Sequence, residues 1–223
     1  MEGTFDFYHF PISQPSRSIH LLLKLVNAPH NVHHVDLISG EHKKPAYLEI
    51  NPFHTVPFLV HGDFSLSESP AIARYIISNV KCDDHWYPAD LKKRARVDEF
   101  LSYHHTTIRK AGVRVAFAFY LTGFFTGKKE TEEDKQAALK GLDETLAVFE
   151  SYFLKSGAFI AGDEISIADL FAASEQILQA DMSKKDYLAS RPKVKEWLER
   201  VKEATKPHFE EVFQPFNDFV KTL

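Results

Sequence analysis

The stretch Ser67-Glu68-Ser69 places one carboxylate between two hydroxyl groups. Ile72, Tyr75 and Ile76 follow at helical spacing, so a helix is expected to begin near Glu68. The first-turn N–H groups and the positive end of the helix dipole attract a ligand carboxylate, while Glu68 can pair with an ammonium group. The stretch can therefore hold the charged end of a small zwitterion. An acid in the first turn of a capped helix is also common where it serves structure alone.

Ser13 is a second candidate, near the predicted start of the first helix. A strand is expected to end near Phe10, Pro15 suits the first helical turn, and Ser13 or Ser16 can cap it. A hydroxyl group in that position can also donate to an anion, which the helix dipole attracts. If the anion is a thiolate, the thiol pKa falls below its usual value of about 8.5. Capping alone is the simpler account of both serines.

Val56-Pro57 directly precedes a predicted β-hairpin. Residues 58–60 form an apolar run, Gly62-Asp63 supplies the turn, and residues 64–66 alternate with period two. Pro57 is tolerated at the start of a strand because no ladder donor is required there, and an X-Pro bond is the one at which a cis peptide is cheap. In the cis form the main chain of Val56 would be turned outward and could pair with an extended ligand backbone.

The elements that must position these groups alternate between strands and helices in the first 80 residues. The expected elements are a strand at 4–10, a helix with Ile19, Leu22, Leu23 and Val26, a strand at 32–37, a short helix at 43–50, the hairpin, and the helix from Glu68. The order βαβαββα predicts an α/β domain with a small mixed sheet and helices packed against it.

Long helical patterns dominate after residue 88. Two apolar stripes with spacings of three and four are typical of antiparallel bundle helices. The stripes consist of Val97, Phe100, Leu101, His104 and Ile108, and of Leu139, Leu142, Leu146, Phe149 and Phe153. The polar segment before them carries Pro88 and resembles a linker. We therefore predict a first domain at 1–80, a linker at 81–88 and an all-α helical bundle at 89–223.

Two further patterns in the second half favour structural roles. Ser166-Ile167-Ala168-Asp169 has the form of a capping box, with Ile165 and Leu170 placed for the hydrophobic staple. The C-terminal residues Phe209, Val212, Phe213, Phe216 and Val220 form an apolar helical stripe. Most of that stripe is expected in the core, and its end could cover a ligand cleft.

Composition limits the classes of partner. The net charge is −4, from 27 Lys and Arg and 31 Asp and Glu, so the chain has no basic footprint for nucleic acid. No apolar stretch approaches the roughly 18 residues of a membrane span, and the N-terminus lacks a signal-peptide pattern. Cys82 is the single cysteine, which excludes an internal disulfide and suits a reducing compartment. We expect a cytoplasmic protein without a nucleic-acid or membrane partner.

Several histidines raise the question of a metal site. His30, His33 and His34 form a cluster after Pro29, but alternate residues near a strand point to opposite faces. We therefore interpret them as solvated loop histidines and expect no metal. His104 lies on an apolar stripe and is expected to be a partly buried, hydrogen-bonded core residue.

Longer motifs carry a family resemblance along essentially the whole chain. These motifs are Ser13-Gln14-Pro15, Val35-Asp36-Leu37, Gly40-Glu41-His42, Asn51-Pro52, Val56-Pro57, Ser67-Glu68-Ser69 with Ala71-Ile72, His85-Trp86-Tyr87-Pro88, the run at 94–101, and His105-Thr106-Thr107-Ile108-Arg109. With them the sequence resembles the theta class of cytosolic glutathione transferases. The resemblance implies a thioredoxin-like N-terminal domain, an all-helical C-terminal domain and a homodimer. It also implies conjugation of glutathione, a co-substrate, to small electrophiles, with peroxidase activity as an option and no cofactor.

The resemblance assigns the glutathione contacts residue by residue. Ser13 corresponds to the serine that hydrogen-bonds the glutathione sulfur and stabilises the thiolate. Val56, before Pro57, corresponds to the residue that pairs with the cysteinyl backbone. Glu68 and Ser69 correspond to the pair that holds the γ-glutamyl group.

The glycyl end of glutathione is where the chain departs from the family pattern. His42 corresponds to a histidine near that end, but His54 and Thr55 stand where many theta members have two lysines. The cationic contact to the glycyl carboxylate therefore falls to His42, Lys43 or His54.

On the electrophile side, the resemblance points to segments from both halves. The candidate residues are Pro11, Ile12, Thr106, Arg109 and Phe216. Among these, Arg109 could contact a polar or anionic part of the substrate.

Two other functions are compatible with the same fold. A cysteine-based thioltransferase needs a nucleophilic cysteine at the first helix start, but the chain has Ser13 there and Cys82 in the predicted linker. A non-catalytic module that binds glutathione or hydrophobic ligands, or that serves structure alone, stays an alternative because fold does not imply catalysis.

Overall fold

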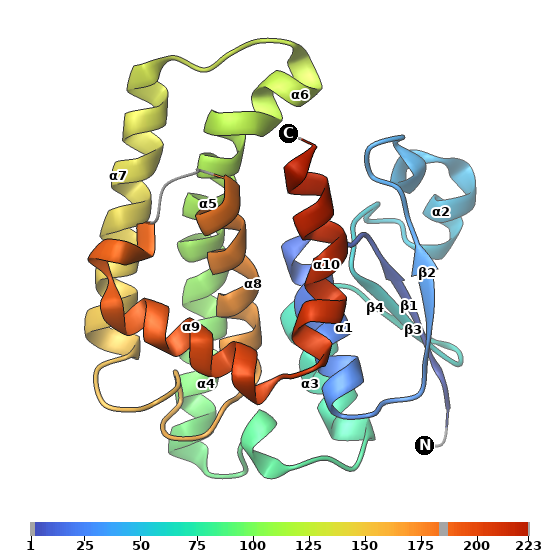
Figure 1. Cartoon of the computed structure of the whole chain (residues 1–223). Coiled ribbons are helices and arrows are strands. Elements are labelled where there is room, and N and C mark those ends of the chain that lie inside the picture. Colours follow the sequence, from blue (N-terminus) through green and yellow to red (C-terminus); the bar gives the residue numbers. More distant parts are fainter. Residues whose placement is uncertain (1–2, 183–186, 223) are drawn as a thin grey trace. The chain divides into compact units, whose positions relative to one another are not determined.

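A four-stranded mixed sheet organises the N-terminal part of the chain. The computed structural model describes residues 3–182 and 187–222 (Figure 1). The strands are β1 (Phe5–His9), β2 (His30–His34), β3 (Phe58–His61) and β4 (Phe64–Leu66). Their order is β2-β1-β3-β4, with β1 parallel to β2 and antiparallel to β3. Strand β1 alternates as expected of a sheet with a covered face: Phe5, Phe7 and His9 are buried.

The helices of this part are α1 (Gln14–Leu25), α2 (Pro45–Ile50) and α3 (Ser69–Asn79), and a 3-10 turn spans Glu41–Lys43. Pro residues occupy the first turn of all three helices, where their missing N–H groups are not needed. The predicted order βαβαββα is confirmed, and so is the hairpin, with its turn at Gly62 in the left-handed region.

The second strand lies earlier than the predicted 32–37. It ends at His34 because the carboxylate of Asp36 accepts hydrogen bonds from the N–H groups of Ile38 and Ser39, which turns the chain. The interpretation of His30, His33 and His34 as loop residues is therefore wrong, because all three belong to β2. Nε2 of His33 lies 2.8 Å from the Asp6 carboxylate on β1.

Three of these elements contribute to a row of ring contacts, which we call the imidazole row. It runs from His30 on β2 through His20 on α1 and His9 on β1 to His34 on β2. The successive ring centroids lie 5.9, 5.3 and 6.2 Å apart. Within the described residues, no group of three histidine, cysteine or acidic side chains is arranged to hold a metal ion.

The C-terminal part is helical. Its elements are α4 (Leu91–Thr106), α5 (Ile108–Ala116), a π-helical segment at Phe117–Leu121, α6 (Thr122–Thr126), α7 (Glu132–Val148), a second π-helical segment at Phe149–Phe153, α8 (Ile167–Met182), a 3-10 turn at Tyr187–Ser190, α9 (Pro192–Ala204) and α10 (His208–Lys221). A 3-10 turn at Asp84–Trp86 lies in the segment predicted as a linker. This architecture confirms the all-helical second half (Figure 1).

Two details differ from the predicted apolar stripes. The stripe from Val97 to Ile108 is buried throughout, but it crosses a break at Thr107, whose φ of −121° and ψ of −79° separate α4 from α5. In α7, Ala138 is buried whereas Leu139 is only half-buried. Helix curvature and packing, which periodicity does not encode, decide such one-residue shifts.

The predicted capping box at the start of α8 is confirmed in its main feature. The carboxylate of Asp169 accepts hydrogen bonds from the N–H and hydroxyl groups of Ser166, at 2.9 and 3.0 Å. It also accepts from the main-chain N–H of Ile160 and from Nε1 of Trp197 on α9, at 3.0 and 2.8 Å. Asp169 is fully buried, and burial raises the pKa of its carboxyl group, while these donors oppose the rise.

By packing, the chain divides into two units. The first contains the residues up to Asp83 together with Pro207–Phe216, and the second contains Asp84–Lys206 together with Asn217–Leu223. The first two turns of α10 therefore belong to the sheet-containing unit. The predicted domain boundaries, 1–80, 81–88 and 89–223, stay a prediction.

Over its described residues, the chain has no helix of the length and apolar character that spanning a membrane requires.

Candidate active site

Ser13 occupies the N-cap position of α1. Its main chain has the extended conformation of an N-cap, and its carbonyl oxygen accepts the 3.1 Å hydrogen bond from Arg17 N–H that opens the helix. Within the described residues its hydroxyl group makes no capping hydrogen bond, and the side chain is half-buried. Ser16 does not cap α1 either, because its buried hydroxyl accepts from Phe10 N–H at 3.4 Å. Capping thus explains neither serine, and the Ser13 hydroxyl is available at a helix N-terminus.

The loop before Pro57 is held by two side chains, Tyr47 on α2 and Asn51 at its C-cap. The hydroxyl group of Tyr47 and the amide of Asn51 both donate to the carbonyl oxygen of Thr55, at 2.7 and 2.8 Å. The Val56-Pro57 bond is cis, as the sequence allowed. Within the described residues, no hydrogen bond joins the main chain of Val56 to another residue. The N–H and carbonyl groups of Val56 are therefore free to pair with a ligand.

Glu68 and Ser69 form the start of α3, as predicted. Glu68 is the N-cap, its side chain is exposed, and its φ of 65° lies in the left-handed region that non-glycine residues rarely adopt. The carbonyl oxygen of Glu68 accepts the 2.9 Å bond from Ile72 N–H that begins the helix. The site combines an exposed carboxylate with the positive end of a helix dipole, so it can hold an ammonium group and a carboxylate together.

Three basic side chains lie in the segment between β2 and β3. His42 and Lys43 lie in the 3-10 turn that follows Gly40, and His54 lies in the loop held by Tyr47. Nδ1 of His42 is buried and lacks a partner among the described residues. Burial, and then the positive charges of Lys43 and His54, lower the pKa of His42. The exposed ammonium group of Lys43 therefore supplies a positive charge that attracts an anion to this segment.

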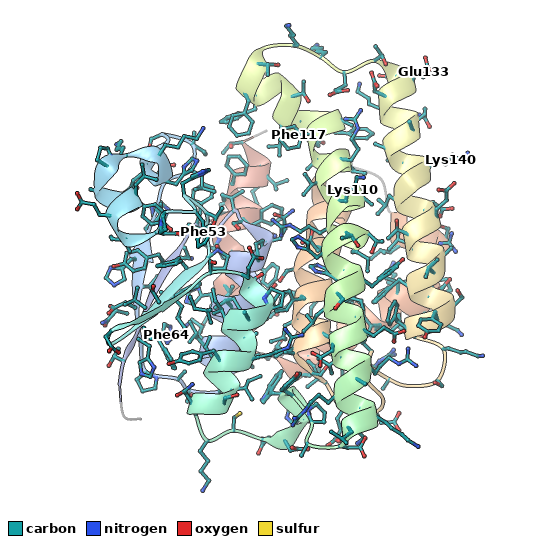
Figure 2. The ribbon with its side chains drawn as sticks, turned by 180° about the vertical axis from the view of Figure 1, so that it is seen from behind. Phe53, Phe64, Lys110, Phe117, Glu133 and Lys140 are labelled. Carbon is teal, nitrogen blue, oxygen red and sulfur yellow. The ribbon has the colours of Figure 1, made fainter. Side chains whose placement is uncertain are left out.

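The exposed side chains of this loop mark it as a surface feature. Thr55 and His54 are exposed, and Phe53 is 61% exposed (Figure 2). Lys43 is also exposed, so its ammonium group can reach a ligand without desolvation of a buried charge.

The residues predicted to contact the electrophile differ in how far they are buried. Pro11 and Ile12 are half-buried next to Ser13, and their carbonyl oxygens accept hydrogen bonds from the Arg17 guanidinium. Phe216 is fully buried and packs against Arg17, so its ring is not open to a ligand in this structure. Its burial favours a packing role over direct contact.

In the helical unit, Thr106 is exposed at the end of α4, and Arg109 lies in the first turn of α5. Nη1 of Arg109 lies 3.5 Å from Oε1 of Glu175, with side chains 30% and 1% exposed respectively. Nε2 of His104 is also 3.5 Å from that oxygen, yet it makes no hydrogen bond within the described residues. His104 is buried as predicted, but the predicted hydrogen bond of its ring is not observed at Nε2.

Two buried charged residues that contact predicted site residues were not predicted from the sequence: Arg17, which bonds to Pro11 and Ile12, and Glu175, which lies beside Arg109. Glu175 follows the apolar residues 170–173, and this charge next to an apolar helical stretch was an available signal, because charged residues are rarely buried unless they have partners. Arg17 lies between Ser16 and Ser18, where the sequence gives no such signal.

The comparisons with known proteins agree on one family. Residues 7–81 match the model of the glutathione S-transferase N-terminal domain, and residues 109–204 match that of its C-terminal domain. The glutathione S-transferase theta-1 of Homo sapiens is 37% identical over 96% of this chain and 88% of that protein.

Solved structures agree as well. Human glutathione S-transferase T1-1 in its apo form has a TM-score of 0.92 at 36% identity, covering 96% of this chain and 89% of that chain. Human glutathione transferase theta-2, in a complex with glutathione and an unknown ligand, has a TM-score of 0.91 at 30% identity, covering 97% and 89%.

Proposed function

Because the chain belongs to the theta class of the glutathione S-transferases, we propose that it conjugates the thiolate of glutathione to electrophilic substrates. The observation that carries the proposal is that the Ser13 hydroxyl lies at the N-terminus of α1 and makes no capping hydrogen bond among the described residues. In this mechanism the hydroxyl donates a hydrogen bond to the sulfur, and the helix dipole adds to the stabilisation of the anion.

The chemical step needs no covalent bond to the protein. The thiol proton leaves for solvent, the thiolate forms a carbon–sulfur bond with the electrophile, and the leaving group departs with its electron pair. A free thiol has a pKa of about 8.5, and a drop of ~2 units, or about 2.7 kcal/mol, makes the thiolate the major form at neutral pH. Ser13 contributes to the rate by this stabilisation, and the bound tripeptide contributes proximity.

The remaining glutathione contacts are proposed from the family roles and supported by the geometry. Glu68 binds the ammonium group of the γ-glutamyl residue, and Ser69 binds its carboxylate at the start of α3. Val56 pairs its unengaged main chain with the cysteinyl backbone, next to Pro57.

The glycyl carboxylate is proposed to meet the basic groups around the loop at 51–57. His42, Lys43 and His54 together take the role that two lysines have in many theta members. Thr55 belongs to the same loop and is the fourth proposed contact of this part of glutathione. Burial, and then the positive charges of Lys43 and His54, lower the pKa of His42, and an anion bound beside these side chains would offset that unfavourable environment.

For the electrophile we propose contacts from Pro11, Ile12, Thr106 and Arg109. A homodimer, a cytoplasmic location and glutathione-dependent peroxidase activity are further proposals that rest on the family resemblance and the composition.

The proposal is tested by the kinetics of the wild type and Ser13→Ala with glutathione and a panel of substrates. Haloalkanes, aryl halides and epoxides report conjugation, and hydroperoxides report the peroxidase reaction, in which two glutathione molecules reduce the hydroperoxide to an alcohol and water and become glutathione disulfide. Wild-type turnover with one class of electrophile is expected, and Ser13→Ala should lower kcat by about 100-fold or more while glutathione affinity changes only a few fold. The ultraviolet absorbance of the bound thiolate should appear at higher pH in the variant. Glutathione binding without turnover of any electrophile would instead favour a non-catalytic module.

A further inference from the structure

Arg17 carries a buried positive charge in the first turn of α1, four residues after Ser13. Its side chain is 1% exposed, and Nη1 donates hydrogen bonds to the carbonyl oxygens of Ile12 and Pro11, at 2.8 and 3.1 Å. The main-chain N–H of Arg17 donates to the carbonyl oxygen of Ser13 at 3.1 Å. One residue therefore holds all three carbonyl groups of the segment 11–13, and it determines where the Ser13 side chain stands.

The other side of the Arg17 guanidinium faces α10. Its central carbon lies 4.2 Å from the ring centroid of Phe216 and 5.2 Å from that of Phe213. The Phe213 ring in turn stacks on Phe209, with centroids 4.2 Å apart and an angle of 10° between planes. The aromatic rings exclude water from the guanidinium and attract its charge through their faces. A guanidinium cannot lose its proton in a protein, so the charge persists in this apolar setting.

We propose that Arg17 is a positioning residue, which couples helix α10 to Ser13 and favours the thiolate of bound glutathione. The proposal rests on the role of Ser13 proposed above. It has two physical parts. The hydrogen bonds to segment 11–13 orient the Ser13 hydroxyl toward the sulfur, and a weakly screened positive charge within one helical turn of that hydroxyl stabilises a nearby anion.

The proposal predicts that α10 affects the thiol pKa of bound glutathione only through the contact of Arg17 with Phe213 and Phe216. A second link joins the same two helices: Nζ of Lys24 lies 2.9 Å from the carboxylate of Glu211. Lys24 is at the far end of α1 from Ser13, and its pair with Glu211 is partly exposed. Lys24→Met is therefore a matched control, because it loosens α1 from α10 without touching segment 11–13.

The test is a pH titration of the thiolate absorbance of bound glutathione in the wild type, Arg17→Met, Arg17→Lys, Phe216→Leu and Lys24→Met. Arg17→Met should raise the thiol pKa by about one unit, since both the charge and the hydrogen bonds are lost. Arg17→Lys and Phe216→Leu should raise it less, and Lys24→Met should leave it unchanged. A wild-type pKa in folded Arg17→Met, or equal shifts in Arg17→Met and Lys24→Met, would overturn the proposal.

A second readout does not depend on glutathione. Hydrogen exchange of the Ser13 amide, which is bonded to the Phe10 carbonyl oxygen at 2.9 Å, should be about tenfold faster in Arg17→Lys and Phe216→Leu than in Lys24→Met. If Arg17→Met does not fold, these two milder variants decide. A wild type without any thiolate absorbance would refute the role of Ser13, and unchanged amide exchange would refute the coupling by itself.

Discussion

The hydroxyl group of Tyr47 donates a 2.7 Å hydrogen bond to the main-chain carbonyl oxygen of Thr55. Tyr47 is 5% exposed and lies on α2, whereas Thr55 is an exposed residue of the loop that leads to Pro57. The amide of Asn51 donates to the same oxygen. Two buried donors, the side chains of Tyr47 and Asn51, thus hold the loop that is proposed to bind the backbone of glutathione.

We expect Tyr47→Phe to weaken glutathione binding without changing the chemical step. Loss of one buried hydrogen bond costs about 1 kcal/mol, part of which appears as a looser loop and a KM for glutathione about three- to fivefold higher. The value of kcat at saturating glutathione should stay near wild type. Initial-rate kinetics check this, with Tyr120→Phe in the helical unit as the control. An unchanged KM in Tyr47→Phe would show that Asn51 alone holds the loop.

Glu68 combines a proposed ligand contact with an unfavourable backbone conformation, and two substitutions separate the effects. Glu68→Gln keeps the shape and removes the charge, so glutathione affinity should fall about tenfold or more. Glu68→Gly removes the same contact but accepts a φ of 65° without strain. We expect equal losses of affinity, with Glu68→Gly more stable than Glu68→Gln by about 0.5–1 kcal/mol. Calorimetric binding and urea unfolding measure the two quantities.

We expect His9 and His20 of the imidazole row to make the protein less stable in mild acid. Burial, and then the charges of the neighbouring histidines, lower the pKa of His9 to about 3, and burial is also the main cause that lowers the pKa of His20 to about 4. An unfolded histidine has its usual pKa of about 6.5. Between the two values the unfolded chain binds a proton that the folded chain lacks, so the free energy of unfolding decreases as the pH falls.

At pH 5, His9 alone is expected to lower the free energy of unfolding by about 2 kcal/mol relative to neutral pH. Urea unfolding at several pH values should show a steeper dependence in the wild type than in His9→Gln. His105→Gln changes an exposed histidine outside the row and should keep the wild-type slope. Equal slopes in all three proteins would contradict a neutral, buried His9.

Removal of the Arg109 charge should destabilise the protein more than removal of the Glu175 charge. The Glu175 side chain is 1% exposed and that of Arg109 is 30% exposed, so only the carboxylate depends on its partner for solvation. Arg109→Met leaves a buried carboxylate and is expected to cost about 3 kcal/mol of stability. Glu175→Gln leaves a guanidinium that can turn toward water and should cost about 1 kcal/mol. Thermal unfolding of the two variants gives the order, and a larger loss in Glu175→Gln would reverse the argument.

Local signals in the sequence were sufficient to predict most strands and helices of the N-terminal part. The hairpin followed from Gly62 and the apolar runs on either side of it, and α3 began where the acid and hydroxyl groups predicted. Strand β2 was misplaced because the Asp36 side chain, which ends it, bonds to main-chain groups two and three residues ahead. That competition between a turn and a strand was visible in the residue types but not in the hydrophobic pattern.

The candidate site was predictable where its groups sit at helix starts and beside a proline. Ser13, Val56, Glu68 and Ser69 are all marked by such positions, and the family resemblance supplied their roles. Phe216 differs from these residues. It was a candidate for contact with the electrophile, but the structure buries its ring against Arg17.

The sequence by itself determined which segments fold into strands and helices and which residues stand at their ends, because turn, cap and periodicity signals act between near neighbours in the chain. Only the tertiary structure decided the partners of the buried polar groups. Arg17 meets Phe216, and Asp169 meets Trp197, because folding brings together segments that are distant in sequence. A buried charge is stable only with such partners, so these contacts, rather than the local pattern, determine that Arg17 and Asp169 can be buried.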